Sequence, residues 1–328
     1  MTEAVASREE YASFDLARKP RSPMRDALTI LLQNKVAVGS GIFLILLVLV
    51  AIFASYIAPE GIDEQKLADN YMSPSWADPE SPYILGADQF GRDVLSRVLY
   101  GARVSLSVAV AAASVSLLIG LTYGLIAGFM GGTVDNVMMR IVDILYGFPF
   151  LIFVILLQVY FKAVAARAGP GSIAAPLIAL DRQMGGMLFI FIALGALNWI
   201  GMSRIARGQV LAYKEMEFVQ GARMIGAGTP RIIFRHLLPN ILGPCIVAET
   251  MAIPGYIFTE AFLSFIGLGV NAPTPSWGIM IQNGYQSLRA HPHVLWAPAI
   301  ALTITTLAFN FLGDGLRDAF DPRMKGTF

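Results

Sequence analysis

Long stretches with few or no charged residues recur along the chain, separated by polar segments. A helix of about 20 apolar residues crosses the hydrocarbon core of a bilayer. Six stretches meet this requirement, at residues 36–58, 104–134, 137–161, 183–203, 241–265 and 294–313. The pattern predicts an all-α integral membrane protein with six transmembrane helices.

The first span contains the run IFLILLVLVAIF and carries no charge. A cleaved signal peptide is the alternative interpretation, but a long polar segment precedes the run, and its apolar core is too long for a signal peptide. Within that segment, Ser22 and Pro23 suit the N-cap and first position of a short amphipathic helix that ends at Gln33. We expect residues 1–20 to be disordered.

The segments that flank the second and third spans predict local departures from straight helices. In residues 92–103, Val94, Leu95, Val98 and Leu99 share one helical face, so we expect this helix to lie flat at the outer interface. The second span is longer than one crossing requires. Pro149 is expected to bend the third span.

The distribution of basic residues predicts the orientation. With the N-terminus inside, the segments on that side carry sixteen Lys and Arg residues and the opposite side carries eight. Cytoplasmic segments carry the excess of basic residues, so we expect both termini to be cytoplasmic. The predicted divisions are a tail (1–35), the first span (36–58), an external loop with an interfacial helix (59–103), a five-span core (104–314) and a second tail (315–328).

Composition supports a membrane protein and excludes several chemistries. Hydrophobic residues make up 55% of the chain and charged residues 14%, against about a quarter charged in soluble domains. The net charge of +1 gives no reason to expect nucleic-acid binding. A single cysteine, Cys245, excludes an internal disulfide. His291 and His293 could touch a metal, but histidines on a loop without nearby carboxylates are usually solvated, so no metal site is expected.

Glycines recur every fourth residue along the second span, at Gly120, Gly124, Gly128 and Gly132. Such a stripe lets another helix approach closely. The sequence leaves open whether the partner helix belongs to this chain or to another subunit.

The loop between the fourth and fifth spans, residues 204–240, predicts a helix, a glycine turn and a second helix. Helix-forming residues run over 215–225, and Gly226 suits the left-handed position that ends a helix. Thr229 fits the next N-cap and Pro230 the first helical position, while Pro239 is expected to stop that turn before the membrane helix. Such a projection suits insertion into a groove on another protein; the alternative is a basic interfacial loop.

This loop resembles the coupling motif of bacterial binding-protein-dependent ABC importers: Glu-Ala-Ala, three residues, Gly, nine residues, Ile, one residue, Leu-Pro. Three positions depart, with Gln220 for Glu, Gly221 for Ala and His236 for Ile, but the spacing is retained. The resemblance implies contacts with an ATPase subunit. The residues expected to make them are Glu217, Gln220, Gly221, Ala222, Arg223, Gly226, Leu238 and Pro239.

Two further segments resemble the C-type permease subunit of oligopeptide and dipeptide importers. They are ILGADQFGRDVLSRVLYGARVSL at residues 84–106 and TEAFLSFIGLGVNAPTPSWGIMI at residues 259–281, joined by Met139-Arg140-x-x-Asp143. The stretch 162–184 is longer than the usual external loop of this family, and the sequence assigns it no role.

The resemblance implies a subunit without bond-making chemistry of its own. No G-x-x-x-x-G-K-[ST] motif occurs, so ATP and Mg²⁺ are expected in partner subunits and no cofactor in this chain. The implied partners are a second permease subunit, two ATPase subunits, an extracytoplasmic solute-binding protein and the lipid bilayer. The implied location is the bacterial cytoplasmic (inner) membrane.

Acidic residues inside the predicted spans are candidates for the transport pathway, because charge in a bilayer is costly. Glu249 and Glu260 are eleven residues apart, which places them on nearly the same helical face, and Asp143 is the third candidate. The alternative is that each glutamate sits near a helix end or is hydrogen-bonded to a neighbouring helix.

Other functions stay open at this stage. The same architecture carries nickel or another small solute in related permeases. A proton- or ion-coupled secondary transporter that uses Glu249, Glu260 and Asp143 belongs to a different class, but the sequence has no convincing internal repeat. An intramembrane hydrolase is a more distant alternative, because no nucleophile–base pairing is visible.

Overall fold

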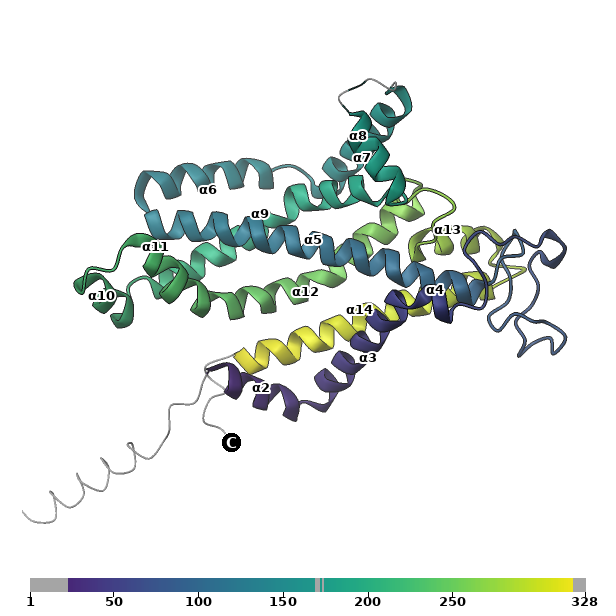
Figure 1. Ribbon diagram of the computed structural model, residues 1–328, viewed down its shortest axis with the longest axis horizontal. Helices are drawn as coiled ribbons and strands as arrows, with labels where there is room; N and C mark the ends of the chain where they lie inside the picture. Colours follow the sequence, from purple (N-terminus) through teal and green to yellow (C-terminus); the bar gives the residue numbers. More distant parts are fainter. Residues whose placement is uncertain (1–22, 169–171, 173, 321–328) are drawn as a thin grey trace, which may run out of the picture.

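The computed structural model describes residues 23–168, 172 and 174–320. Within this part of the chain, six helices are long and apolar enough to cross a membrane. They are α3 (Lys35–Ile52), α5 (Val94–Met130), α7 (Phe150–Arg167), α9 (Met187–Tyr213), the helical segment Thr229–Phe265, and α14 (His293–Phe320). Figure 1 shows most of them side by side, with α7 and the short α8 (Ala175–Gln183) projecting from one side. The prediction of six apolar helices is confirmed.

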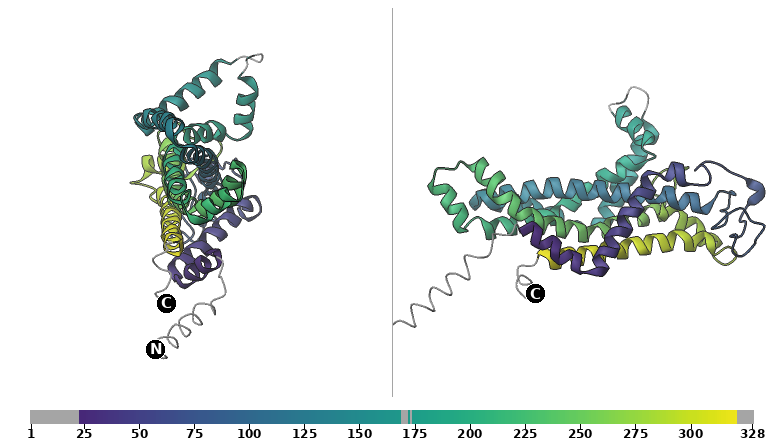
Figure 2. Two further views of the ribbon diagram at one scale, coloured as in Figure 1. Left: turned by 90° about the vertical axis from the view of Figure 1, so that its left-hand side faces the viewer. Right: turned by 60° about the horizontal axis from the view of Figure 1, so that its bottom comes forward.

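The elongated bundle has two different ends. One end, here named the loop end, carries residues 58–93 and α13 (Trp277–Ser287); the opposite end carries α10 (Glu217–Met224), as Figures 1 and 2 show. α2 (Pro23–Gln33), α3 and the short α4 (Ala54–Ile57) lie along α14 and α5. The predicted N-terminal helix is confirmed, whereas Ser22 and the disorder expected for residues 1–20 lie outside the described residues.

The expected flat interfacial helix is wrong, because residues 94–103 form the first turns of α5, which continues without a break to Met130. Asp93 caps this helix, with its carboxylate accepting hydrogen bonds from the backbone N–H groups of Leu95 (3.3 Å) and Ser96 (2.8 Å). Arg97, in the first turn of this helix, is only 3% exposed. The helix is buried by the loop folded over it, which a periodicity argument does not detect.

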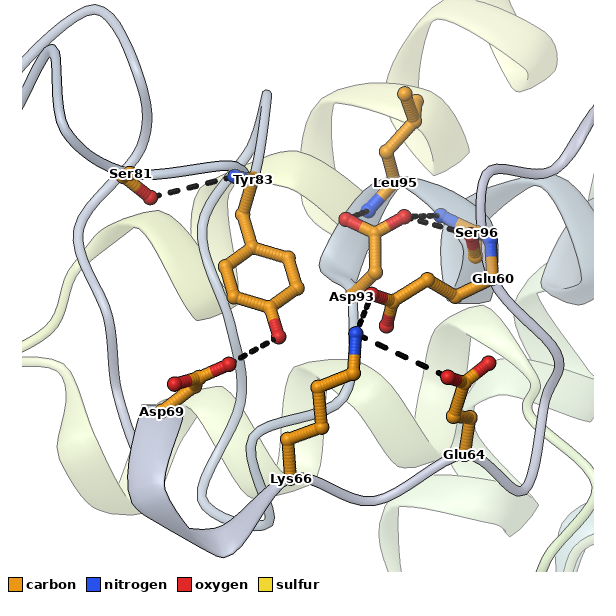
Figure 3. Close-up of polar contacts among 9 residues, drawn as sticks. All are labelled: Glu60, Glu64, Lys66, Asp69, Ser81, Tyr83, Asp93, Leu95 and Ser96. Carbon is orange, nitrogen blue, oxygen red and sulfur yellow. Dashed lines mark hydrogen bonds and ion pairs between the residues drawn. The ribbon is translucent and has the colours of Figure 1, made fainter.

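The loop of residues 58–93 is ordered by polar contacts with itself and with the start of α5 (Figure 3). Lys66 forms ion pairs with Glu60 and Glu64, and the Tyr83 hydroxyl donates to Asp69 at 2.7 Å. Burial and the hydrogen bond to Asp69 raise the pKa of Tyr83.

Buried charges join the same loop to α5. Asp88 forms an ion pair with Arg92 at 2.6 Å and with Arg97 at 3.5 Å. The Gly-Arg-Asp segment that carries the family resemblance therefore has a structural role here.

The predicted third span is divided into two helices. α6 (Gly132–Tyr146) ends at Gly147, and α7 begins directly after Pro149. Only α7 is apolar and long enough to span. Pro149 was correctly placed at the irregularity, but it separates two helices instead of bending one: its backbone is extended, with ψ = 112°, and proline has no N–H to continue a helix.

The glycine stripe packs against α9 of this same chain. A Cβ atom at Gly120 would lie 2.6 Å from Cβ of Met202, and one at Gly128 would lie 3.0 Å from Cβ of Val210. Gly124 is tighter still, against the backbone carbonyl of Ser203. Gly132 is outside this contact, with nothing within 4 Å of its Cβ position. Three glycines thus permit the close α5–α9 approach that organises the bundle.

The fifth span begins earlier than the sequence predicted. α11 (Thr229–Arg231), the π-helical turn η2 (Ile232–Leu237) and α12 (Leu238–Phe265) form one continuous helical segment. The expectation that Pro239 stops a preceding turn is therefore wrong. Pro239 is the second residue of α12 and directly follows the π-helical turn and Leu238, so the helical segment continues past a residue that has no backbone N–H to donate. Thr229 is the first helical residue after Gly228.

Candidate functional site

α10 is a short helix held at one end of the molecule between two long helices, α9 and the segment that continues into α12 (Figure 1). The backbone N–H of Gly226 donates to the carbonyl of Arg223 (3.0 Å), and that of Ala227 donates to Ala222 (3.0 Å). Gly226 has φ = 83°, the left-handed conformation that glycine adopts without strain. The helix–glycine–helix prediction is confirmed, with the helix spanning Glu217–Met224 rather than 215–225.

One face of α10 fixes it to the body of the protein. Val219 is fully buried and Ala222 is 5% exposed. Val219 belongs to an apolar cluster that includes Val210, Ile232 and Leu237. Ala222, expected among the docking residues, thus faces inward and positions the helix.

α10 and the residue that caps its C-terminus expose large apolar side chains that sequence reasoning missed. Met224 is 85% and Ile225 86% exposed, and Phe218 is 40% exposed. Exposed apolar side chains on a loop between two spans are candidates for a contact with another protein. The sequence does contain a signal for them, because positions 218, 224 and 225 are apolar among the polar residues of the loop.

The other expected coupling residues surround this apolar surface. Glu217, Gln220, Arg223 and Gly226 are exposed, and Gly221 is half-buried. The Arg223 guanidinium lies over the Phe129 ring at 5.9 Å, which connects α10 with the end of α5. The last two expected residues, Leu238 and Pro239, begin α12, with Leu238 partly buried and Pro239 exposed.

A cavity of about 490 Å³ lies in the middle part of the bundle. Its lining combines Ser116 of α5, Asn198 of α9 and Glu249 and Tyr256 of α12 with apolar and aromatic side chains from α6, α7 and α9. Glu249 accepts hydrogen bonds from the Tyr256 hydroxyl (2.8 Å) and the Ser116 hydroxyl (3.1 Å). A carboxylate, a phenol and an amide therefore face one apolar space, the usual composition of a small-molecule site.

Glu260 lies elsewhere, in a closed environment. It is fully buried, and its two carboxylate oxygens accept hydrogen bonds from Ser105 (2.8 Å) and Ser264 (2.7 Å). Glu260 does not line the cavity of Glu249. Ser116 and Ser105 of α5, which donate to Glu249 and Glu260, are also eleven residues apart. Both glutamates therefore face α5, which agrees with the prediction that they share one helical face.

Asp143, the third pathway candidate, is not brought together with the glutamates. It lies on α6 with its side chain 56% exposed and forms an ion pair with Arg204 of α9 at 2.8 Å. A second α6–α9 ion pair is more buried: Arg207 donates two hydrogen bonds of 2.6 Å to Asp135. The sequence analysis did not predict this pair. Asp135 directly follows the predicted second span, residues 104–134, and was used there only to mark the end of that span.

The residues that the structure describes contain no group of three or more His, Cys, Asp and Glu side chains arranged to hold a metal. His291 stacks on Tyr71 with ring centroids 4.2 Å apart. His293 places Nε2 3.4 Å from the carbonyl oxygen of Ala87. Both rings therefore contact the loop of residues 58–93.

Comparison with known proteins identifies related sequences along nearly the whole chain. Residues 120–326 match the family described as "Binding-protein-dependent transport system inner membrane component". Residues 22–74 match the "N-terminal TM domain of oligopeptide transport permease C".

Individual relatives align over most of their length. The dipeptide transport system permease protein DppC of Bacillus subtilis (strain 168) is 40% identical over 323 residues, covering 98% of this chain and 92% of DppC. The oligopeptide transport system permease protein OppC of Escherichia coli (strain K12) is 41% identical, covering 96% of each chain. The glutathione transport system permease protein GsiD of Pectobacterium atrosepticum is 36% identical, covering 93% of each.

Proposed function

Since the chain belongs to the family of binding-protein-dependent inner-membrane transport components, we propose that it is one permease subunit of an ATP-driven importer of di- or oligopeptides. The family is a transport component rather than an enzyme. We propose a peptide substrate because the three relatives described above are named as dipeptide, oligopeptide and glutathione transport permeases.

The exposed surface of α10 is the observation that carries the coupling part of the proposal. Phe218, Met224 and Ile225 form an apolar surface at the end of the molecule, on a helix fixed to α9 and α12 by Val219 and Ala222. Movement of a partner that grips this surface would be transmitted to both long helices. We assign the partner as an ATPase subunit, one of two in the complex, which bind the ATP and Mg²⁺.

This assignment determines the orientation of the chain in the membrane. The α10 end faces the cytoplasm together with both termini, and the loop end faces outward, toward a solute-binding protein. A second permease subunit completes the pathway. Within this chain, the cavity of Glu249 is the proposed part of the pathway, because it is the space into which a buried carboxylate and Tyr256 project.

A substitution at Gly221 tests the coupling proposal. No atom lies within 4 Å of the position of a Cβ at Gly221, so the first side-chain atom of a substituted residue fits in this chain, and a bulky side chain there is placed to obstruct a partner. We expect Gly221→Trp to insert normally but to separate ATP hydrolysis from peptide uptake in reconstituted vesicles.

Gly221→Ala is the matched control at the same position. Its single methyl group fits the open space and favours the helix by about 1 kcal/mol, so uptake should stay close to wild type. Coupled uptake in the Trp variant at the wild-type rate would contradict docking at α10.

A further inference from the structure

A second cavity, of about 260 Å³, lies toward the loop end, away from the cavity of Glu249. It is lined by Gln158, Lys162 and Ala165 of α7, Asp181 of α8, Gly186, Phe189 of α9 and Asn271. Asp181 belongs to the stretch 162–184, for which the sequence suggested no role. The cavity sits where the projecting α7 and α8 of Figure 1 join α9.

The buried side chain of Gln158 lacks a partner. Gln158 is only 1% exposed, and its Nε2 is buried without a hydrogen-bond partner among the described residues. Burying an amide without a hydrogen bond is costly, so an N–H donor that faces a cavity in this state indicates a ligand that accepts from it.

Lys162 supplies a positive charge to the same cavity. Its ammonium group donates one hydrogen bond of 3.0 Å to the carbonyl oxygen of Gly267, and an ammonium has three donors. Lys162 and Gln158 stand four residues apart on α7, which places them on one face of the helix. Together they offer donors that suit a carboxylate.

Asp181 supplies the opposite charge. It is 6% exposed, and its Oδ1 accepts a hydrogen bond from the backbone N–H of Phe189 at 3.2 Å. Burial raises the pKa of Asp181. No ion pair within 4.0 Å joins it to Lys162 among the described contacts, so both charges remain able to meet a ligand.

The walls between these groups are fixed by the backbone. The N–H of Asn271 donates to the carbonyl of Gly185 at 2.9 Å, which ties the turn before α9 to the loop that follows α12. Gly186 has φ = 85°, and a Cβ there would lie 2.6 Å from the Asn271 side-chain amide. The ring of Phe189, stacked on Phe161 at 4.7 Å, adds an apolar surface.

We propose that this cavity is a binding site for a small zwitterion, an α-amino acid or a dipeptide, whose carboxylate meets Gln158 and Lys162 and whose ammonium group meets Asp181. One water molecule takes up about 30 Å³ in the liquid. The cavity volume of 260 Å³ therefore corresponds to roughly nine water molecules, or to a ligand of roughly nine non-hydrogen atoms. This is the range between a small amino acid and the shortest dipeptides. The site is separate from the proposed pathway, and its occupancy is measured without transport.

Equilibrium binding to the full-length chain, purified with its partner subunits in lipid nanodiscs, tests the proposal. The probes are radiolabelled L-alanine and radiolabelled glycylglycine. We expect saturable binding of at least one of them. The probe that binds shows whether the site takes a free amino acid or a dipeptide. N-acetyl-L-alanine, which lacks the ammonium group, and L-alaninamide, which lacks the carboxylate, should compete at least about ten-fold more weakly.

Substitutions assign the binding to this cavity. Lys162→Met and Asp181→Asn should each weaken binding at least about ten-fold, because each removes a charge-assisted contact. Arg167→Met on α7 and Arg182→Met on α8 are the matched controls: both residues are exposed and neither lines the cavity, so binding should stay at the wild-type level.

Gln158→Leu separates a binding role from a structural one. Because Nε2 of the amide has no partner among the described residues, the variant should unfold at the wild-type temperature or above it, yet bind the probe more weakly. The proposal is overturned if neither probe binds saturably, if the blocked derivatives compete as well as L-alanine, or if the three cavity variants bind like wild type. None of these results bears on ATP-driven uptake.

Discussion

Two buried glutamates of α12 differ in what they face, and this difference separates a transport role from a structural one. Glu249 lines a cavity of about 490 Å³, whereas Glu260 is fully buried between the hydroxyls of Ser105 and Ser264. The sequence predicted their common helical face but could not predict this difference, because it depends on where α9 and α6 leave space.

Replacing each glutamate by glutamine should therefore have opposite effects. We expect Glu249→Gln to impair peptide uptake with normal assembly, because it removes the one carboxylate that lines the cavity among the described residues. Glu260→Gln should leave uptake near wild type, since an amide can still exchange hydrogen bonds with the two serines. Uptake and the yield of assembled complex, measured for both variants, test this. Normal uptake across peptides of several charges in Glu249→Gln would remove that residue from the pathway.

At the same scale, the ion pair of Asp135 and Arg207 is predicted to stabilise the fold over most of the pH range. The hydrogen-bonded guanidinium holds the pKa of Asp135 below its usual value of 3.8. A carboxyl group with a lowered pKa contributes stability above its unfolded pKa, and this contribution is lost as the pH falls through the folded pKa.

We expect Asp135→Asn to lower the free energy of unfolding by about 1–2 kcal/mol near neutral pH. The difference from wild type should be constant between about pH 5 and 8 and should shrink below about pH 4. Thermal unfolding at several pH values measures it. The control is Asp143→Asn. The ion pair of Asp143 with Arg204 is largely exposed, so its loss should lower the free energy of unfolding by less than about 1 kcal/mol. Equal losses in the two variants would contradict this account.

At the scale of elements, the α5–α9 contact depends on three glycines. Gly120→Ala places a Cβ 2.6 Å from Cβ of Met202, and overpacking of this kind costs about 1–3 kcal/mol. Gly208→Ala on α9 is the control, because nothing lies within 4 Å of its Cβ position. We expect a lower unfolding temperature for Gly120→Ala alone. Equal stability of the two variants would show that the close approach is not needed.

Element boundaries mark where sequence reasoning succeeded and where it failed. Stretches with few or no charges located the six apolar helices because desolvated charge is costly in a membrane. They could not show that α5 starts at Val94, since its polar first turns are buried by contacts with residues 58–93, which are distant in the sequence. Pro149 separates two helices, whereas Pro254 lies inside α12. Proline alone does not decide which outcome occurs, because neighbouring helices can satisfy the freed backbone groups.

The candidate sites were predictable to different degrees. The α10 segment was located correctly because Gly226 and the following proline mark the end of one helix and the start of the next. Which residues face outward was not predictable, so Ala222, which is buried, was expected among the docking residues, and Ile225 was not. The cavity of Gln158, Lys162 and Asp181 joins three elements and leaves no mark in the local sequence.

For the whole molecule, the proposed orientation places α10 in the cytoplasm and the loop of residues 58–93 outside. Trp76 and Ile225 are 76% and 86% exposed, and the native Cys245 is fully buried. Wild-type protein should therefore react slowly with a membrane-impermeant maleimide. In intact cells, Trp76→Cys should be labelled and Ile225→Cys should not, and inverted vesicles should reverse the result. Labelling of Ile225→Cys from outside would reverse the orientation and separate α10 from any cytoplasmic ATPase.

The energy source for uptake tests the central claim most directly. The complete complex, reconstituted in vesicles with its solute-binding protein, would be supplied with ATP and a radiolabelled peptide in the presence of a protonophore. We predict that uptake requires ATP and the binding protein and that it persists when the proton gradient is abolished. Uptake that follows a proton gradient without ATP, or that this chain performs without ATPase subunits, would contradict the account.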